Sequence, residues 1–313
     1  MVSETLPKLP VINLSNENLK PGTSDWISTC NDVTKALEEY GCFVAVYDRV
    51  PVELHNAVFS AAEELFTLPM ETKRKNTSDK PYFGFVGGNP FIPLHESLGI
   101  DHGNTIESVQ SFTSLMWPIG NNHFSESMLS YAKLVAELDQ MVKKMVFESY
   151  GVGKYYESHI ELTSYLLRPN KYRPPMDKET NIGVSSHTDK TFITILHQNH
   201  VNGLQTKARD GKWISFDDAS PSSFVVMAGD AFLAWSNDRI HSPNHQVIMN
   251  GDEVRYSLAL FSFSNEMVKV PEELVDDEHP LKFKPFDHFE LLQHYYTDTG
   301  RSSECTVRNH YAI

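Results

Sequence analysis

A histidine and an aspartate with the spacing of metal ligands stand just after the middle of the chain. His187 and Asp189 are two residues apart in "SSHTDKTF", at the edge of an expected strand, so both side chains point to one face. One imidazole and one carboxylate, joined by a second histidine, bind neighbouring positions of a metal ion and leave the others open. That set is typical of non-haem Fe(II) oxygenases. Taken alone, the pair also fits a turn or a helix cap, where His and Asp are common.

The second histidine is expected in "HSPNHQV", which offers His241 and His245. Their spacing resembles a helical zinc protease motif, but Pro243 lies between them and no glutamate follows the first, which excludes HExxH. The turn "NGD" predicts a hairpin that sets Ser257 opposite His245. The hairpin favours His245, while strand parity leaves His241 open as an alternative.

Arg255 and Ser257 follow in "RYS", on the same expected face as His245. An arginine inside a β-structure is costly unless an anion matches its charge, and a planar guanidinium holds a carboxylate with two hydrogen bonds. The carboxylate of a ligand would supply the match. An internal salt bridge with an aspartate or glutamate is the alternative.

The elements that must position these residues are short strands after residue 160. The period changes there from 3.6 towards 2, and turns separate eight candidate strands, as an antiparallel sandwich or barrel requires. We predict a mainly β fold with flanking helices: a double-stranded β-helix, or jelly roll, behind an α-rich N-terminal region. The candidate strands are "LTSYLLR", "TFITILHQ", "GLQTK", "KWISF", "SFVVMA", "FLAWS", "HQVIM" and "VRYSLALFSF".

Helical periodicity dominates the first half. It predicts helices over 24–40, ended by Gly41, from Pro51 to Pro69, and over 125–150, with a last helix from Asp287 to Tyr296. Residues 80–122 are rich in Gly, Pro and Asn and indicate loops. We expect four regions in one globular unit: 1–122, the long helix in 123–160, the jelly roll in 161–270 and a helical segment in 271–313.

Composition limits the partners. The 313 residues carry a net charge of −14, which disfavours nucleic acid and anionic membranes, and no span is apolar enough to cross a membrane. Three cysteines without a CxxC pair, Cys30, Cys42 and Cys305, favour reduced thiols. The expectation is a cytoplasmic monomer that binds a small molecule.

At this point the motifs carry a resemblance. In order along the chain, "LPVINLS", "YGCFVAV", "LFTLPMETK", "HTDKTFITILHQNHVNGLQTKARDGKWI" and "HSPNHQV" with "RYS" resemble the plant 2-oxoglutarate- and Fe(II)-dependent dioxygenases. "LKPGTSDW" and "SFTSLMWPIGN" are most similar to the branch with AOP-type glucosinolate-modifying enzymes, deoxypodophyllotoxin synthase and steroidal-alkaloid hydroxylases.

The resemblance implies a function for each candidate residue. His187, Asp189 and His245 would bind Fe(II), with no catalytic residue beyond this metal site. Arg255 and Ser257 would hold the far carboxylate of 2-oxoglutarate, the co-substrate used with O2 and with ascorbate as reductant. Tyr172 and Asn170 of "RPNKYRPP" would add hydrogen bonds, although the family more often has "NYY". Four further residues are candidates for lining the substrate pocket: Phe192, His241, Phe91 and Phe263.

The expected reaction is the oxidation of a small plant specialised metabolite, by hydroxylation, desaturation, demethylation or ring closure. Two alternatives stay open. One is an oxidase of the same fold that uses another reductant, and the other is a catalytically silent jelly-roll protein that binds a small molecule.

Overall fold

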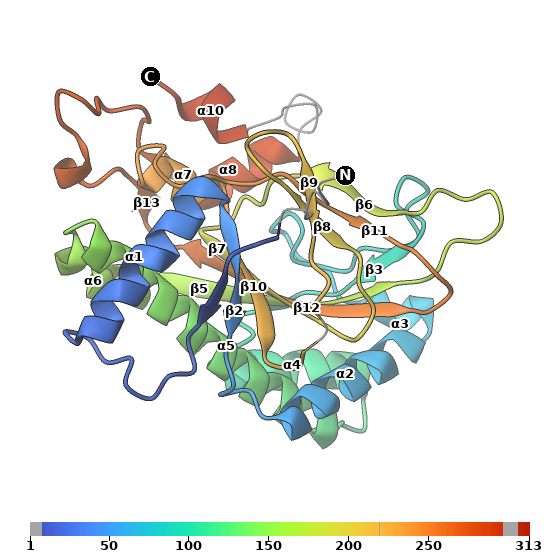
Figure 1. The fold of residues 1–313 in the computed structure, drawn as a ribbon. Helices are drawn as coiled ribbons and strands as arrows, with labels where there is room; N and C mark the ends of the chain where they lie inside the picture. The colour runs from blue at the N-terminus through green and yellow to red at the C-terminus, as the bar shows by residue number, and fades with distance from the viewer. Residues whose placement is uncertain (1–7, 219, 297–305) are drawn as a thin grey trace, which may run out of the picture.

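Two β-sheets form the double-stranded β-helix of the protein (Figure 1). The computed structural model describes residues 8–218, 220–296 and 306–313. The larger sheet has the strand order β1-β2-β10-β7-β12-β5-β3, with β4 beside β5, and the smaller has the order β6-β11-β8-β9. The strands are β1 (Val11–Asn13), β2 (Cys42–Val46), β3 (His95–Ser97), β4 (Ile100–Asp101), β5 (Thr163–Tyr172), β6 (Ile182–His187), β7 (Ile193–Gln198), β8 (Leu204–Lys207), β9 (Trp213–Ser215), β10 (Ser223–Ala228), β11 (His245–Ile248), β12 (Arg255–Ser264), β13 (Met267–Val268) and β14 (Phe286–Asp287).

Seven of the eight candidate strands are confirmed, as β5 and β7 to β12. The eighth, "FLAWS", is wrong, because Asp230–Trp235 forms helix α7. A short, fully buried apolar run has no solvent face, so its periodicity cannot separate a strand from a helix. Strand β6 was missed, because its polar end "SSH" broke the apolar pattern.

The predicted hairpin between His245 and Ser257 is also wrong. β11 pairs with β6 and β8 in the smaller sheet, whereas β12 pairs with β5 and β7 in the larger one. The residues around the "NGD" turn therefore carry the chain from one sheet to the other. The pairing that does form sets His245 opposite His187.

The larger sheet has two different faces. Alternation along β12 places Leu258 and Leu260 in the main hydrophobic core beneath helix α5, and places Phe261 and Phe263 in a separate aromatic cluster on the other face. Only one face of each strand can therefore contribute to a site inside the jelly roll. On the helix side, Asp139 of α5 accepts hydrogen bonds from Tyr165 (2.8 Å) and Ser262 (2.9 Å), which fixes the helix to β5 and β12.

Helices cover the outer face of the larger sheet, where α1, α2 and α5 lie together (Figure 1). α4 was missed within the predicted loops of 80–122. The helices are α1 (Ser24–Glu39), α2 (Val52–Thr67), α3 (Met70–Lys73), α4 (Ile106–Met116), α5 (Asn122–Ser149), α6 (Tyr156–Glu161), α7 (Asp230–Trp235), α8 (His288–Tyr295) and α10 (Thr306–Tyr311), with 3₁₀ turns at Gly153–Tyr155 and Glu272–Leu274.

The end of α1 contacts the segment that leads into β11. Gly41 ends the helix with φ 74°, as the glycine predicted. A Cβ at this position would lie 2.5 Å from the carbonyl oxygen of His241 and 2.6 Å from Pro243. Because β2, which follows, pairs with β10, the N-terminal region shares the larger sheet. This sharing supports the proposal that the four regions form one unit.

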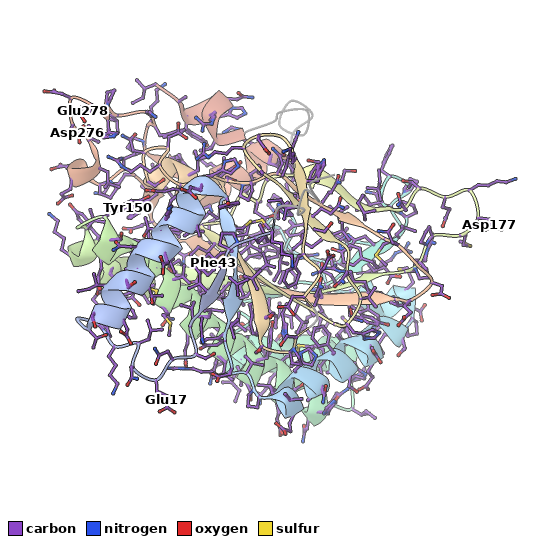
Figure 2. All side chains as sticks on the ribbon, in the orientation of Figure 1. Glu17, Phe43, Tyr150, Asp177, Asp276 and Glu278 are labelled. Atoms are coloured by element: carbon purple, nitrogen blue, oxygen red, sulfur yellow. The ribbon has the colours of Figure 1, made fainter. Side chains whose placement is uncertain are left out.

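The surface and the interior of the molecule differ in the side chains that they hold. Figure 2 shows Glu17, Asp177, Asp276 and Glu278 at the outside, whereas Phe43 lies in the interior. Among the described residues, no helix is long and apolar enough to cross a bilayer. Cys30 and Cys42 are buried free thiols, and Cys305 lies outside the described residues.

Three buried histidines make stability depend on pH. Burial lowers the pKa of His159 to about 2, of His197 to about 3 and of His288 to about 4, against 6.5 in an unfolded chain. Below pH 6.5 these histidines are therefore protonated in the unfolded chain but stay neutral in the folded protein. Between pH 7.5 and pH 5.5 these three groups should lower the unfolding free energy by about 4 kcal/mol, and His95, His187 and His241, whose pKa values are lowered to about 4, add to that loss. Urea unfolding of metal-free protein at pH 7.5 and 5.5 measures this.

The substitution His159→Phe is the matched test, because the Nε2 of this ring has no hydrogen-bond partner and the ring packs on Phe147 and Phe192. It should make the loss between pH 7.5 and pH 5.5 smaller by about 1.4 kcal/mol. His200→Gln, at an exposed site, is the control. An undiminished loss in the His159 variant would contradict the assignment.

Candidate metal centre

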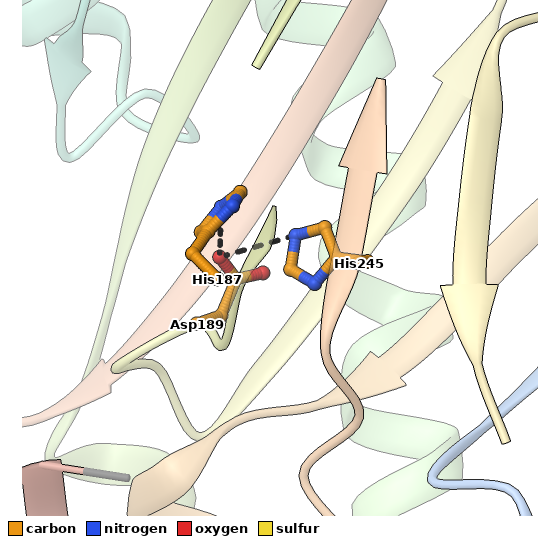
Figure 3. A group of neighbouring side chains, drawn as sticks. All are labelled: His187, Asp189 and His245. Carbon is orange, nitrogen blue, oxygen red and sulfur yellow. Dashed lines mark ion pairs between the residues drawn. The ribbon is translucent and has the colours of Figure 1, made fainter. Parts of the chain in front are cut away.

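His187, Asp189 and His245 converge between the two sheets (Figure 3). The Nε2 atoms of His187 and His245 lie 3.6 and 3.7 Å from the same carboxylate oxygen, Oδ1 of Asp189. Within the described part of the chain, this is the group of His, Cys, Asp and Glu side chains whose ligand atoms could share one ion, since all lie within 4.8 Å of one another. The side chain of His187 keeps 26% of its exposure, so the group is open on that side.

Backbone carbonyls orient both imidazoles. Nδ1 of His187 lies 2.9 Å from the carbonyl oxygen of Ser185, and Nδ1 of His245 lies 3.3 Å from that of Pro243. A carbonyl only accepts, so each Nδ1 carries the proton, and each Nε2 presents a lone pair to the centre. Burial, and then the neighbouring His245, lower the pKa of His187 to about 4. A neutral imidazole is the form that binds a metal.

The carboxylate is held in its ionised form. Burial opposes ionisation of Asp189, but His245, His187 and a hydrogen bond from Thr194 together keep its pKa below the usual value. Thr194 donates its hydroxyl to Oδ2 over 2.6 Å, which leaves Oδ1 directed at the two histidines. Two imidazoles and one carboxylate are the donor set that suits Fe(II).

Asp230 joins the two segments that carry the triad. Its carboxylate accepts from Ser242 (2.7 Å), three residues before His245, and from Lys190 (2.8 Å), one residue after Asp189. Its backbone N–H donates to the carbonyl of Asp189 over 2.8 Å. The side chains of Lys190 and Asp230 are 4% and 0% exposed, so this ion pair is fully desolvated. One buried carboxylate thus sets the position of one segment relative to the other.

Replacing Asp230 with alanine should therefore destabilise the protein by about 3–5 kcal/mol, because Lys190 is left charged and buried without its partner. The double variant Asp230→Ala with Lys190→Met should recover part of that loss, since no charge stays buried. Urea unfolding measures both, and titration with Co(II) should show weaker metal binding in the single variant. A single variant within 1 kcal/mol of the parent would refute the role.

The four residues expected at the co-substrate form two directly opposed pairs. β5 and β12 set Arg255 opposite Tyr172 and Ser257 opposite Asn170. Arg255 is 2% exposed, donates to Gln198 Oε1 (2.9 Å) and lies 3.5 Å from the hydroxyl of Ser257. Its Nε has no hydrogen-bond partner, and among the described residues no carboxylate pairs with it. The internal salt bridge therefore has no support there, and the charge is left for a ligand.

Tyr172 and Asn170 are already in contact with other side chains. The Arg255 guanidinium lies 5.1 Å from the ring centre of Tyr172, and His95 stacks on the same ring at 4.8 Å. Asn170 donates to the carbonyl of Arg168 (2.9 Å) and receives a hydrogen bond from His95 Nε2 (3.2 Å). Tyr172 therefore borders the guanidinium directly, whereas the Asn170 amide is bonded within the wall.

The structure separates the four residues expected at the substrate pocket. Phe263 lies in the inner aromatic cluster, beside Phe83 and Phe289. The ring of Phe192, in contrast, packs on Phe232 and Trp235 in the main core.

His241 and Phe91 lie on two other segments, before β11 and before β3. The backbone N–H of His241 donates to the carbonyl oxygen of Leu37 in α1, and burial, followed by the charges of Arg209 and Arg308, lowers the pKa of its ring to about 4. Phe91 is 88% exposed, in the loop before β3. For Phe192, His241 and Phe91 a place at the substrate pocket stays a prediction.

Three residues of the site were missed at the level of sequence. Arg168 and His95 line the wall beside Tyr172, and Asp230 lies behind the triad. A signal existed for Arg168, because period 2 places residues 168, 170 and 172 on one face. Asp230 was a lone charge inside the apolar run "FVVMAGDAFLAW", which is itself a sign of a buried, paired group. For His95 the preceding loop carried no periodicity to argue from.

Sequence comparisons show which known proteins this chain is similar to. Residues 163–264 match the model of the 2OG-Fe(II) oxygenase superfamily, and residues 9–92 match that of the non-haem dioxygenase N-terminal region in morphine synthesis. The probable 2-oxoglutarate-dependent dioxygenase AOP1.2 of Arabidopsis thaliana is 47% identical over 308 residues, which cover 96% of this chain and 94% of the relative. AOP3 of the same plant is 33% identical, with coverage of 96% and 97%. One relative, 32% identical over 98% of each chain, is described as a probable inactive AOP2.

Solved structures show the same architecture. The rice dioxygenase for auxin oxidation has a TM-score of 0.83 at 28% identity, covering 98% of this chain and 100% of its own. The Arabidopsis thaliana enzyme of that name, in complex with 2-oxoglutarate, has a TM-score of 0.78 at 28% identity, with coverage of 87% and 99%. JOX2, solved with 2OG, Fe and JA, has a TM-score of 0.80 at 22% identity and coverage of 99% and 92%, and so shows the fold alone.

Proposed function

Because the chain belongs to the 2-oxoglutarate- and Fe(II)-dependent oxygenase superfamily and is a 2-oxoglutarate-dependent dioxygenase, we propose that it oxidises a small plant specialised metabolite. The reaction is a hydroxylation, desaturation, demethylation or ring closure. The proposal rests on two observations made together: a His-Asp-His triad, and a buried arginine, Arg255, that lacks a carboxylate partner among the described residues.

In this proposal the metal ligands are His187, Asp189 and His245. Bound Fe(II) with 2-oxoglutarate supplies the activation of O2, and succinate and CO2 are the co-products. The chain contributes three donors, two of them oriented by backbone carbonyls. Thr194 holds the carboxylate, so the ligand set is arranged before the metal arrives.

The co-substrate is held at its far carboxylate by Arg255 and Ser257. Donation by Nε and Nη of one guanidinium matches the two oxygens of a carboxylate, and the unpaired Nε of Arg255 is the donor that such a ligand would satisfy. Tyr172 borders the clamp from the opposing strand, and Asn170 sits behind it. Ascorbate is proposed as the reductant that keeps the metal ferrous.

The remaining features suit a cytoplasmic monomer acting on small molecules. The net charge of −14 disfavours polyanionic partners, and the described cysteines are free thiols. The substrate is expected to meet the aromatic cluster that includes Phe263.

A mass-spectrometric screen tests the function. Purified protein is incubated with plant metabolite extract, Fe(II), ascorbate, 2-oxoglutarate and O2, and an oxygen-dependent product should form with stoichiometric succinate. Product without succinate would identify an oxidase with another reductant. Stoichiometric iron binding without product or succinate would identify a silent binding protein. One relative carries the description of a probable inactive dioxygenase.

A further inference from the structure

Arg168 is a second arginine on the inner face of the jelly roll. It lies on β5 opposite Ala259 of β12, and the same ladder sets Tyr172 opposite Arg255. Arg168 and Tyr172 are four residues apart and so share a face, with their Cα atoms roughly 13 Å apart along the strand. The side chain of Arg168 is 0% exposed. Within residues 8–218, 220–296 and 306–313, no carboxylate forms an ion pair with it.

Neutral groups satisfy only part of this guanidinium. Nη1 donates to the carbonyl oxygens of Tyr82 and Gly84, and Nη2 donates to the hydroxyl of Ser97. Three of the five N–H donors are then used. Nε has no partner, although it is fully buried. The N–H of Nε and the adjacent N–H of Nη2 form the edge that grips a carboxylate with two parallel hydrogen bonds.

A buried charge of this kind is costly unless something matches it. Leaving a cationic donor desolvated and unpaired costs several kcal/mol, and proteins rarely keep such a group without a ligand or counter-ion. 2-Oxoglutarate has two carboxylates; the proposed function places one at the metal and the other at Arg255. Neither is left for Arg168, so a second anion is required.

The surroundings of Arg168 indicate what carries that anion. Its guanidinium carbon stacks 3.9 Å from the ring centre of Tyr82, and Tyr82 contacts Phe261 in the inner aromatic cluster. That cluster is separate from the main core and is built by β5, β12, the segment around Phe83 and helix α8. Its members are Phe83, Leu166, Ala259, Phe261, Phe263 and Leu292, with Tyr82, Leu196, Phe289 and Tyr296 packed against them.

We propose that Arg168 is a specificity-determining residue that binds the carboxylate of the primary substrate, so that this dioxygenase acts on small organic acids with an apolar or aromatic body. The inference rests on the proposed function, since the second anion is deduced from where 2-oxoglutarate binds. The carboxylate takes the Nε and Nη2 edge, and the body lies against the aromatic cluster.

Binding of matched ligand pairs tests this. The probes are a panel of aryl- and alkyl-substituted acetic, propionic and acrylic acids, each with its methyl ester, titrated by calorimetry into protein with Mn(II) and 2-oxoglutarate. The acids should bind at least about tenfold more tightly than their esters, because an ester lacks the charge and one acceptor. Equal binding of acid and ester, or no binding of any acid, would overturn the proposal, and this comparison needs no variant.

Variants then assign the preference to the residue. Arg168→Met should bring the ratio of acid to ester affinity close to one, and Arg168→Lys should give an intermediate ratio, since charge is kept without the planar fork. Arg49→Met, which removes an exposed arginine paired with Glu137, should keep the full ratio. An unchanged ratio in a folded Arg168→Met protein would overturn the assignment, as would a weaker affinity for 2-oxoglutarate alone.

The two proposals can fail separately. If the parent protein shows no succinate release with any substrate while acids still bind through Arg168, the proposed reaction fails and the acid site stands. If succinate forms with neutral substrates and acids have no advantage, the reaction stands and the acid site fails.

Discussion

Replacing Asp189 with alanine is expected to lower 2-oxoglutarate-dependent succinate release by at least about a thousandfold, because it removes the only carboxylate of the proposed ligand set and leaves two neutral imidazoles. Succinate should be measured at saturating Fe(II) and 2-oxoglutarate. Iron content after dialysis should fall in parallel. Asp217→Ala removes an exposed carboxylate of the same chain and should change neither value.

The same substitution should leave the fold of the metal-free protein intact. Asp189 is a buried acid whose hydrogen-bond donor, Thr194, keeps a second partner in the hydroxyl of Thr191 at 2.9 Å. We expect a change in unfolding free energy within about 1 kcal/mol, so that loss of activity cannot be ascribed to unfolding. Retention of succinate release by a folded Asp189→Ala protein would refute the metal assignment.

Replacing Arg255 with methionine should raise the KM for 2-oxoglutarate by about a hundredfold. Two charge-assisted hydrogen bonds to the far carboxylate are lost, each worth about 1.5–3 kcal/mol, partly offset by the freed Ser257 and Gln198. Iron affinity should change far less, since Arg255 donates no ligand to the triad. Initial rates of succinate release at graded 2-oxoglutarate concentrations measure the effect.

The stability of the Arg255→Met protein provides a second, independent test. The unliganded protein holds Arg255 buried, with an unpaired Nε and no acidic partner among the described residues. Methionine removes that desolvated charge, so the variant should be at least as stable as the parent in urea without ligand. The stabilisation that 2-oxoglutarate confers on the parent should be lost. A KM equal to that of the parent would contradict the clamp and move the co-substrate carboxylate towards Arg168.

Local sequence rules predicted most of the elements. Gly41 ends α1, Pro51 precedes α2, and the helix predicted over 125–150 begins and ends within three residues of Asn122–Ser149. Each depends on interactions within a few residues of chain. The errors lie where tertiary context decides, as in the six buried residues of α7, which no local pattern distinguishes from a strand.

The candidate site shows the same division. The triad was expected from spacing and resemblance, and the structure brings its three side chains together. The pairing used to choose His245 was wrong, however, since the chain between Ile248 and Arg255 changes sheets and no hairpin forms. Arg168 and Asp230 were overlooked although the sequence carried a signal for each, and only the structure shows which groups they contact.

The order of strands in the larger sheet has a consequence for synthesis of the chain. Val44 of β2 pairs with Val225 of β10, roughly 180 residues further on. At about 5–20 residues per second, a ribosome needs roughly 10–40 s to cover that distance. During this time "CFVAV", a wholly apolar strand, has only the three residues of β1 beside it. The emerging chain therefore exposes the unpaired, aggregation-prone edge of β2 well before β10 has been synthesised. The yield of folded protein should depend more on chaperone capacity than on the stability of the finished fold.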